Sequence, residues 1–446
     1  MKILIIGNGG REHALAWKCA QSKDVTKVFV SPGNAGTELE EKVKNINIEV
    51  DNFKALSEFA NKEKIDLTIV GPETPLVNGI VDHFNSCGLS CFGPTAAAAQ
   101  LEGSKVFTKD FLKRHKIPTA DSQSFRDINS AIAYIKNKGA PIVIKADGLA
   151  SGKGVIVAMT IKEAENAAIQ MLSGDSFGDA GKKIVIEDYL EGEEISFIVI
   201  TDGKTILPLA TSQDHKAKND GDTGPNTGGM GAYSPAINNK KIEQKIINEI
   251  IQPTLNGMRF DGHPYLGFLY AGLMILPDGT PKVIEFNCRL GDPETQPILM
   301  RFKSDLPLIC LSVINGTLSK ETVEWDTRAA LGVVLAAGGY PVDYKTGEVI
   351  EGLEQVNTKF QKVFHAGTNS KNGRIKTDGG RVLCVVGLGD SVTLAAKNAY
   401  DAVDKIYWDK VVKIEKVKRD FDISRKNFFV YINKKLTFFK INLNKI

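Results

Sequence analysis

Two lysines and a carboxylate–amide pair give this sequence residue types that can hold phosphate groups and a divalent cation. Lys145 ends the apolar run "IVIK", where a charge is costly unless an anion meets it. Lys105 precedes a helix-like stretch and offers a second cation. In "VIEFN", Glu285 and Asn287 stand two apart on an expected strand, so both side chains project from one face. A carboxylate and an amide oxygen on one face suit Mg²⁺, which takes its other ligands from phosphate oxygens and water.

The segment "GLASGKG", residues 148–154, resembles a phosphate-binding P-loop but fails the pattern at two positions. A P-loop requires Gly at 147 and Ser or Thr at 154, where this chain has Asp147 and Gly154, and it opens a helix. Here strand-like runs lie on both sides, so the segment is predicted to be a hairpin tip whose amides and Lys153 fold over phosphates. Glycine-rich hairpins are common, and a single lysine or a Glu–Asn pair fits a solvated surface about equally well. Their coincidence in one chain favours a nucleotide site.

The opening "KILIIGNGGREHAL", residues 2–14, has the strand–loop–helix order of a dinucleotide-binding unit. The fingerprint G-x-G-x-x-G needs a third glycine, but Glu12 stands there after Gly7 and Gly9. The next expected strand ends in "SP" instead of the acidic residue that binds a ribose hydroxyl. NAD is therefore disfavoured. An anion at the helix N-terminus, with Arg11 as a bidentate partner, is favoured over a plain glycine turn.

The elements that must position these residues begin with an alternation of strands and helices over the first hundred residues. Strands are predicted in "KILIIG", "KVFVSPGNAG", "IDLTIVGPE" and "LSCFGPT", with a first helix from about Glu12 to Gln21. Short apolar strands separated by helices predict an open parallel sheet, whose Gly- and Pro-rich strand ends line a ligand crevice. The fold class is thus α/β, with α+β parts further along the chain.

Hairpins and single strands dominate the remainder. Two strands are predicted in "KKIVIEDYLEGEEISFIVITDG", and a hairpin turns at "PDGTP". The region from about Ala329 to Ile423 is β-rich with one amphipathic helix near "VTLAAKNAYDAVDKI". Of the last twenty residues, eighteen are Lys, Asn, Ile, Phe, Tyr or Leu, which favours a read-through end over a basic surface anchor.

Composition excludes several classes of protein. The 446 residues carry 24% charged side chains and a formal charge of +3, ordinary for a globular protein and too small to imply nucleic-acid binding. Six scattered cysteines without a C-x-x-C pair predict buried, reduced thiols. No apolar run approaches the roughly 18 residues that span a bilayer. A cytoplasmic protein without nucleic-acid or membrane partners is expected.

The order of Lys105, Lys145, "GLASGKG", "VIEDYLEGEE" and "IEFN" resembles the ATP-grasp superfamily. With "GNGGREHA", "KADGLASGKGV", "SQDHK", "DTGPNTGGMGAYSP" and "EFNCRLGDPETQ", the chain resembles the phosphoribosylamine–glycine ligase (glycinamide ribonucleotide synthetase) family from Met1 to about Trp408. The family implies cytoplasmic ATP-dependent ligation of glycine to 5-phosphoribosylamine through glycyl phosphate, in purine biosynthesis. It also implies Mg²⁺ or Mn²⁺, ATP as co-substrate, and a monomer or weak homodimer.

The resemblance assigns residues to three groups. It places Lys105 and Lys145 on the phosphates beneath the lid, Glu187 with the backbone of Asp188 to Leu190 on adenine, and Glu194 on the ribose. The whole ATP group is Lys105, Lys145, Gly148, Ser151, Gly152, Lys153, Gly154, Glu187, Asp188, Tyr189, Leu190 and Glu194. The metal ligands are Glu285 and Asn287.

The substrate group implied by the resemblance includes the opening loop, which would face a sugar phosphate. It comprises Asn8, Gly9, Gly10, Arg11, Glu12, Gly71, Pro72, Glu73, Asp214, Arg289, Asp292 and Glu294. Catalytic roles fall on Lys145, Asp214, His215, Lys216 and Arg289.

Three domains are expected, together with three departures from the family pattern. Residues 1–103 would form the N-terminal substrate-phosphate domain, 104–325 a two-lobed ATP-grasp domain with a mobile lid at about 120–190, and 326–424 the C-terminal domain; 425–446 is an atypical basic tail. "LYAGLMI" lacks a further metal carboxylate, Leu290 replaces the usual Phe, and the family's ending is only echoed in "FDISRK". Another ATP-grasp ligase, such as a biotin-dependent carboxylase, and a non-catalytic nucleotide-binding protein are the alternatives.

Overall fold

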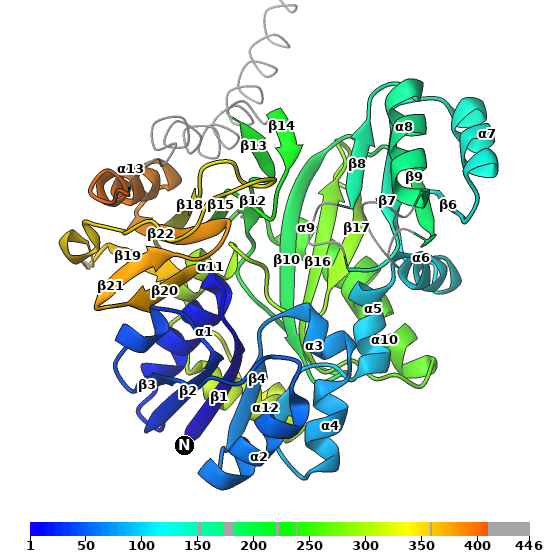
Figure 1. Ribbon diagram of the computed structural model, residues 1–446. Coiled ribbons are helices and arrows are strands. Elements are labelled where there is room, and N and C mark those ends of the chain that lie inside the picture. Colours follow the sequence, from blue (N-terminus) through cyan, green and yellow to red (C-terminus); the bar gives the residue numbers. More distant parts are fainter. Residues whose placement is uncertain (150–153, 174–181, 220–222, 238, 357–358, 409–446) are drawn as a thin grey trace, which may run out of the picture.

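The opening apolar run forms the middle strand of a parallel sheet with the order β3-β2-β1-β4-β5 in the computed structural model (Figure 1). The structure describes residues 1–149, 154–173, 182–219, 223–237, 239–356 and 359–408. The strands are β1 (Lys2–Gly7), β2 (Lys27–Pro32), β3 (Val43–Asn45), β4 (Leu67–Val70) and β5 (Cys91–Phe92). The helices are α1 (Gly10–Ala20), α2 (Phe53–Glu63), α3 (Glu73–Val77), α4 (Ile80–Ser86) and α5 (Ala96–Gly103).

The predicted parallel sheet is confirmed, with two differences in detail. The helix α1 begins at Gly10, two residues before the expected start, because Gly9 serves as its N-cap. The strand β3 was not predicted, since its three residues are too short to show a period. The carboxyl ends of β1 and β4 place the opening loop beside the segment that follows Val70.

The region expected to form the lid, called the lid below, is a separate four-stranded antiparallel sheet, ordered β6-β9-β7-β8, with two helices packed on it (Figure 1). Its elements are β6 (Ser122–Phe125), α7 (Ile128–Lys138), β7 (Ile142–Ala146), β8 (Val155–Ala158), α8 (Ile161–Leu172) and β9 (Ile184–Asp188). The predicted hairpin around "GLASGKG" is confirmed by the pairing of β7 with β8. The apolar core of this sheet draws only on residues between Phe125 and Ile186 among those described, so it is separate from the cores of the other sheets.

A second antiparallel sheet, β11-β10-β16-β17, faces the lid. Its strands are β10 (Glu193–Thr201), β11 (Ile206–Pro208), β16 (Gly267–Ile275) and β17 (Pro281–Asn287). The helices of this region are α6 (Lys105–Arg114), α9 (Lys240–Ile246), α10 (Gln252–Phe260), α11 (Thr295–Arg301) and α12 (Leu306–Ile314), and a π-helical turn, Ile247–Ile251, joins α9 to α10. Apolar residues of this sheet pack with those of the first sheet in one core, so the two form a rigid base. The two predicted strands β9 and β10 belong to different sheets, and residues 189–192 between them connect the lid to the base.

The third large sheet has the order β12-β15-β18-β22-β19. Its strands are β12 (Gln213–Asp214), β15 (Gly231–Ser234), β18 (Ala329–Ala336), β19 (Gln361–His365) and β22 (Arg381–Gly389), and α13 (Val392–Val403) packs on it. Two small hairpins are β13 (Ala217–Asn219) with β14 (Thr223–Asn226), and β20 (Thr368–Lys371) with β21 (Arg374–Thr377). Because β12 and β15 come from the central part of the chain, the C-terminal sheet is completed by strands from before residue 326. No helix in the described ranges is both long and apolar enough to cross a bilayer.

Candidate active site

A cavity of about 300 Å³ opens where the lid, the base and the loops after β1 and β17 meet. Thirteen of the residues expected in the site line it, although they come from distant parts of the sequence. They are Arg11, Glu73, Lys105, Lys145, Gly148, Glu187, Asp214, Lys216, Glu285, Asn287, Arg289, Asp292 and Glu294.

The ammonium of Lys145 spans the gap between the lid and the base. It lies 3.0 Å from Glu187 Oε1 on the neighbouring lid strand and donates a 3.0 Å hydrogen bond to the carbonyl of Ile284 on β17. The residue is only 4% exposed, so its charge depends on these partners. The expectation that an anion meets this buried lysine is confirmed, but the anion in the structure is the carboxylate of Glu187, and the phosphate contact of Lys145 stays a prediction.

Lys109 is a cavity residue that the sequence analysis missed. Its Nζ lies 3.0 Å from Glu187 Oε2, so one carboxylate pairs with two lysines from different elements. Burial lowers the pKa of Lys109 to about 8 despite the opposing effect of Glu187. Lys109 follows Lys105 by one helical turn on α6, and this i, i+4 spacing is the signal that could have identified it.

The start of the glycine hairpin is anchored to the helix that carries these two lysines. Ser104 caps α6 and also donates to Asp147 Oδ1 at 3.0 Å, and the amide of Val106 donates to the same oxygen at 3.1 Å. Lys105 Nζ donates to the carbonyl of Gly148 at 2.9 Å. Asp147, where a P-loop has glycine, thus ties the hairpin to the α6 N-terminus.

Glu285 and Asn287 share one face of β17, as their spacing predicts. Glu285 pairs with Gly272 and Asn287 with Tyr270 in the antiparallel ladder, and both line the cavity. A Cβ on Gly272 would lie 3.1 Å from Glu285 Cγ, so glycine there leaves room for the carboxylate. Burial alone would raise the pKa of Glu285, but three lysines, led by Lys216, hold it below its ordinary value.

An acidic cluster lies beside that face. Glu294 is 4% exposed and accepts hydrogen bonds from Tyr270 at 2.9 Å and from Ser196 at 3.2 Å. Asp214 lies 3.9 Å from Lys216 Nζ, and burial raises the pKa of Asp214 to about 8. Lys216 also pairs with Glu194, which draws the carboxylate of Glu194 toward the cavity wall.

Arg289 is held by two carboxylates from the first part of the chain. Its Nε lies 3.2 Å from Glu73 Oε2, and its Nη2 lies 2.8 Å from Glu102 Oε1. The other oxygen of Glu102 accepts from the amide and the thiol of Cys288 at 2.7 and 2.9 Å. Glu102 was not predicted as a site residue. One of its oxygens binds the backbone of Cys288, next to Asn287, and the other binds the guanidinium of Arg289.

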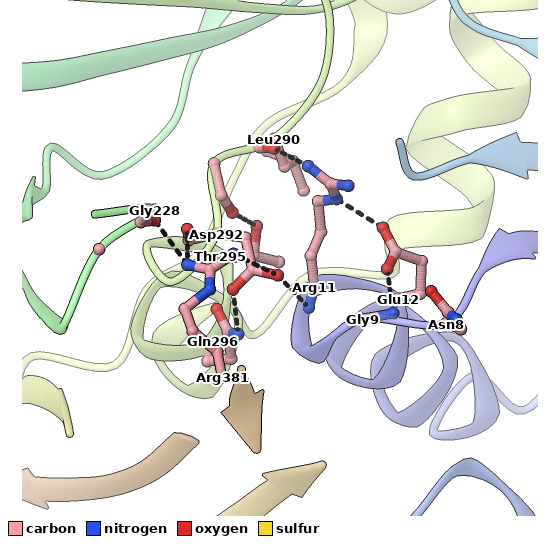
Figure 2. Close-up of polar contacts among 12 residues, drawn as sticks. Asn8, Gly9, Arg11, Glu12, Gly228, Leu290, Asp292, Thr295, Gln296 and Arg381 are labelled. Carbon is pink, nitrogen blue, oxygen red and sulfur yellow. Dashed lines mark hydrogen bonds and ion pairs between the residues drawn. The ribbon is translucent and has the colours of Figure 1, made fainter. Parts of the chain in front are cut away.

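The opening loop is already filled with protein carboxylates, which changes the expectation of a bare anion site (Figure 2). Glu12 Oε2 accepts from the amide of Gly9 at 2.6 Å, and Glu12 Oε1 pairs with Arg11 Nε at 2.5 Å. Asp292 Oδ2 accepts from the amide of Arg11 at 3.3 Å. Two of the amide groups at the α1 N-terminus are therefore occupied, and the guanidinium of Arg11 also donates to the carbonyl of Leu290 at 3.1 Å.

Glu12 explains the missing fingerprint glycine. Its side chain is 2% exposed, and a Cβ on Gly71 would lie 2.0 Å from Glu12 Oε1. Glycine at 71 is thus required for the carboxylate to cross from α1 to the end of β4. Glu12 is not among the residues that line the cavity, so its expected substrate contact stays a prediction, and its contacts with Gly9 and Arg11 shape the loop.

Arg381, also missed from the sequence, brings the C-terminal sheet into the cavity (Figure 2). Its Nη1 donates to the carbonyls of Gly228 and Asp292 at 2.5 Å each, and its Nη2 lies 3.7 Å from Asp292 Oδ2. Arg11 and Arg381 thus approach Asp292 from opposite domains. Arg11 contacts Asp292 through its backbone amide, while its guanidinium binds Glu12 and the carbonyl of Leu290; both Arg11 and Arg381 line the cavity.

Comparisons with known proteins identify the family of this chain. Residues 1–102 match the N domain of phosphoribosylglycinamide synthetase, residues 103–295 its ATP-grasp (A) domain, and residues 330–413 its C domain. The chain belongs to the phosphoribosylglycinamide synthetase family. It is an ATP-dependent ligase of the ATP-grasp type, which sets aside the alternative of a non-catalytic protein.

Relatives within the phosphoribosylglycinamide synthetase family cover nearly the whole chain. A phosphoribosylamine–glycine ligase of Escherichia coli strain K12 is 62% identical over 411 residues, covering 92% of this chain and 96% of its own. A solved phosphoribosylamine–glycine ligase from Thermotoga maritima is 33% identical, with a TM-score of 0.79 and coverage of 92% and 98%. A biotin carboxylase domain of Hydrogenobacter thermophilus, solved with MgADP, has a TM-score of 0.70 at 16% identity, covering 92% and 91%, and shares the fold alone.

Several of the residues expected in the site do not line the cavity, and their roles stay predictions. His215 is 1% exposed, and its amide and carbonyl pair with the backbone at Gly231 and Met230. Asp188 forms a 2.8 Å ion pair with Lys138, and Tyr189 is 41% exposed at the connection between lid and base. Also outside the wall are Asn8, Gly9, Gly10, Gly71, Pro72, Gly154, Leu190 and Glu194. Ser151, Gly152 and Lys153 fall outside the described residues.

Proposed function

We propose that this chain joins glycine to 5-phosphoribosylamine with consumption of ATP, forming glycinamide ribonucleotide, ADP and phosphate. The observation that carries the proposal is the composition of one cavity. Two lysines that could bind phosphate, a strand face with a carboxylate and an amide that could bind a metal ion, and an acidic cluster all line it. The curated relatives of the chain are phosphoribosylamine–glycine ligases. The same relatives favour this reaction over other ATP-grasp ligations.

The chemistry requires that a poor electrophile be activated away from water. The glycine carboxylate attacks the γ-phosphoryl group of ATP and gives glycyl phosphate and ADP. The neutral amine then attacks the acyl carbon, phosphate leaves, and the nitrogen loses one proton. Phosphoryl transfer depends on charge neutralisation and in-line positioning, which Lys105, Lys145 and the hairpin amides would supply. An exposed acyl phosphate would hydrolyse, so the lid must close over it.

The nucleotide is proposed to lie between the lid and the base. In this arrangement Lys105 and Lys145 would bind phosphates beneath the hairpin of residues 148–154, and Lys145 would exchange the Ile284 carbonyl for a phosphate oxygen. Glu187 and the backbone of residues 188–190 would hold adenine where the chain passes between the two sheets. Glu194, already drawn inward by Lys216, would take the ribose hydroxyls.

The donor set fits a magnesium or manganese ion that arrives with the nucleotide. Glu285 and Asn287 offer one carboxylate and one amide oxygen on a cavity-facing strand. Among the described residues, no group of three His, Cys, Asp or Glu side chains could hold a metal ion, so phosphate oxygens and water would complete the shell. When bound, the ion would neutralise negative charge on the transferring phosphoryl group.

Glycine and the ribosylamine would bind to the rest of the cavity wall, each beside side chains of opposite charge. Glycine is a zwitterion, so its ammonium group suits the acidic cluster of Asp214 and Glu294, and its carboxylate suits Arg289. Asp214 is the last residue of β12, and His215 and Lys216 follow it directly. The phosphate of the ribosylamine would face Arg11 and Arg381, near the loops at Asn8–Glu12 and Gly71–Glu73.

One assay decides among the substrate assignments. ADP release is measured with glycine and phosphoribosylamine together, with each omitted, and with alanine or serine in place of glycine. Rapid release is expected only when glycine and phosphoribosylamine are both present. Release with another amino acid but not with glycine would refute the proposal.

We further propose a cytoplasmic monomer or weak homodimer with the domain division 1–103, 104–325 and 326–424. Five of the six cysteines are buried and all are free, as suits a reducing compartment. The separate apolar core of the lid supports a lid lobe at about 120–190 inside the central domain. Gel filtration at several protein concentrations tests the oligomeric state.

A further inference from the structure

His13 lies one turn into α1, two residues after Arg11, and takes no part in the reaction proposed above. It is 1% exposed and faces the C-terminal strand β19. The amide of His365 donates to His13 Nδ1 at 2.8 Å. Because an amide can only donate, Nδ1 must be the unprotonated nitrogen, and the proton lies on Nε2, which is 3.0 Å from Glu40 Oε1.

Asn34 also binds the backbone of His365 on β19. Its Nδ2 donates to the carbonyl of His365 at 2.9 Å and also to the carbonyl of Asn8 at 2.9 Å. Its Oδ1 accepts from the amides of Gly36 and Thr37 at 2.9 and 3.1 Å. Both backbone polar groups of His365 are therefore held by side chains of the first domain, and one of those side chains also holds the opening loop.

The packing at this contact leaves little freedom. A Cβ on Gly36 would lie 2.4 Å from His365 Cγ and 2.5 Å from His13 Cε1, so only glycine fits between the two rings. Glu40 is fixed in turn by Lys362 at 2.7 Å. Burial lowers the pKa of His13, opposed by Glu40, and this keeps Nδ1 available as an acceptor.

The contact lies between the two arginines that line the cavity, Arg11 and Arg381. Arg11 lies on the same helical turn as His13, and the amide of Gly367, two residues after His365, donates to the carbonyl of Arg381 at 2.9 Å. A short path therefore runs from Arg11 through His13 and His365 to Arg381. A shift of the first domain against the third sheet would change the separation of the two guanidinium groups.

We propose that His13 and Asn34 are positioning residues that dock the opening loop on strand β19 and thereby set Arg11 and Arg381 at the spacing needed to bind the phosphate end of the ribosylamine substrate. The inference rests on the proposed placement of that phosphate. Neither side chain touches substrate; each acts through the backbone of His365.

Two isosteric replacements of His13 separate the docking bond from the rest of the side chain. In His13→Asn the amide oxygen takes the place of Nδ1 and can still accept from His365. In His13→Gln the amide group takes the place of Nε2, so the bond to Glu40 survives and the bond to His365 is lost. Asn34→Asp keeps the acceptor for Gly36 and Thr37 but removes the bonds donated to His365 and Asn8 and a longer one, 3.5 Å, to the carbonyl of Gly9.

The probe is glycinamide ribonucleotide, the stable product, titrated calorimetrically into each full-length variant, with MgADP as the reference ligand. His13→Gln and Asn34→Asp are expected to weaken binding of the ribonucleotide about tenfold and to leave MgADP binding within error of the parent, while the loss of buried hydrogen bonds lowers the melting temperature. His13→Asn is expected to restore binding to within about twofold. Lys362→Met, which leaves the His13–His365 bond in place, serves as the matched control.

Three results would overturn the inference. The first is unchanged ribonucleotide binding in His13→Gln while Arg381→Met loses it, which would leave the proposed function standing. The second is a parallel loss of MgADP affinity, or equal losses in His13→Asn and His13→Gln, because either would mean general structural damage. The third is absence of ribonucleotide binding by the unaltered protein, which would remove the proposed function as well.

Discussion

Lys145 and Glu187 pair across neighbouring lid strands at 3.0 Å, and the same lysine reaches the carbonyl of Ile284 on the base. Glu187, which also pairs with Lys109, holds the ammonium group of Lys145 in the cavity wall before any nucleotide arrives. A phosphate oxygen that replaces the Ile284 carbonyl would convert this contact from a lid–base tether into a ligand contact.

Replacing Lys145 with alanine is expected to lower kcat at least about 100-fold, because one of the charges that neutralises the transferring phosphoryl group is lost. Folding should persist, since Glu187 keeps its 3.0 Å pairing with Lys109. The measurement is steady-state ADP release, with circular dichroism as the check on folding. Lys136→Ala, an exposed lid lysine paired with Glu165, is the control. An unchanged rate in Lys145→Ala would remove this residue from the phosphate site.

Glu285→Gln is expected to raise the Mg²⁺ concentration needed for half-maximal activity at least about tenfold, because a carboxylate ligand becomes a neutral amide. Chelation of divalent ions should abolish ADP release in the parent, and added Mg²⁺ should restore it. Asp278→Asn, in the exposed turn of the same β16–β17 hairpin, should behave like the parent. An identical Mg²⁺ titration for Glu285→Gln would contradict the ligand assignment.

Glu102→Gln is expected to weaken glycine binding more than it slows turnover. The substitution keeps the shape of the side chain but removes the charge that fixes Arg289 Nη2 at 2.8 Å, leaving Glu73 as the remaining carboxylate partner. We expect the KM for glycine to rise about tenfold and the free energy of unfolding to fall by about 1–3 kcal/mol. Initial rates over a glycine series and urea unfolding test both. A KM that stays at the parent value would show that Arg289 needs no second carboxylate.

Much of this site follows from local rules that the sequence displays. The lysine at the end of "IVIK" was expected to be buried because it follows an apolar strand. Glu285 and Asn287 were expected to project from the same face because side chains alternate along a strand. Lys109, Glu102 and Arg381 could not be found in that way. Their functions depend on meetings between elements far apart in the chain, such as Arg381 with the carbonyl of Gly228.

The opening loop shows both what a local sequence pattern can predict and what it cannot. Its pattern correctly predicted a glycine turn between strand and helix, and the absent third glycine argued correctly against a dinucleotide fingerprint. The pattern did not reveal that Glu12 and Asp292 would occupy the helix amides, because Asp292 arrives from a loop 280 residues later. A sequence pattern can therefore predict a helix N-terminus, but it cannot predict whether side chains from elsewhere in the chain will bind the amides there.

Glu40 makes the stability of the first domain sensitive to acid. Burial would raise the pKa of Glu40, but the hydrogen bond from His13 and the charge of Lys362 outweigh it and lower the pKa to about 2. The stabilisation is therefore fully present above the unfolded-state pKa of about 4.5 and is lost as pH falls toward 2. The difference in unfolding free energy between the parent and Glu40→Gln should shrink by about 1–2 kcal/mol between pH 6 and pH 3. Denaturant titrations across that range measure it, and a constant difference would contradict the low pKa.

Arg381→Met should act on one substrate alone. The methionine retains much of the apolar stem of Arg381, which lines the cavity, but removes the guanidinium that binds the carbonyls of Gly228 and Asp292. We expect the KM for phosphoribosylamine to rise about 10- to 100-fold, as for loss of a charge-assisted phosphate contact, while the KM for ATP changes less than twofold. Arg374→Ala, on the exposed β20–β21 hairpin, is the matched control. Equal rises in the KM for ATP and for phosphoribosylamine would show instead that Arg381 maintains the cavity as a whole, and the assignment of Arg381 to the substrate phosphate would fall.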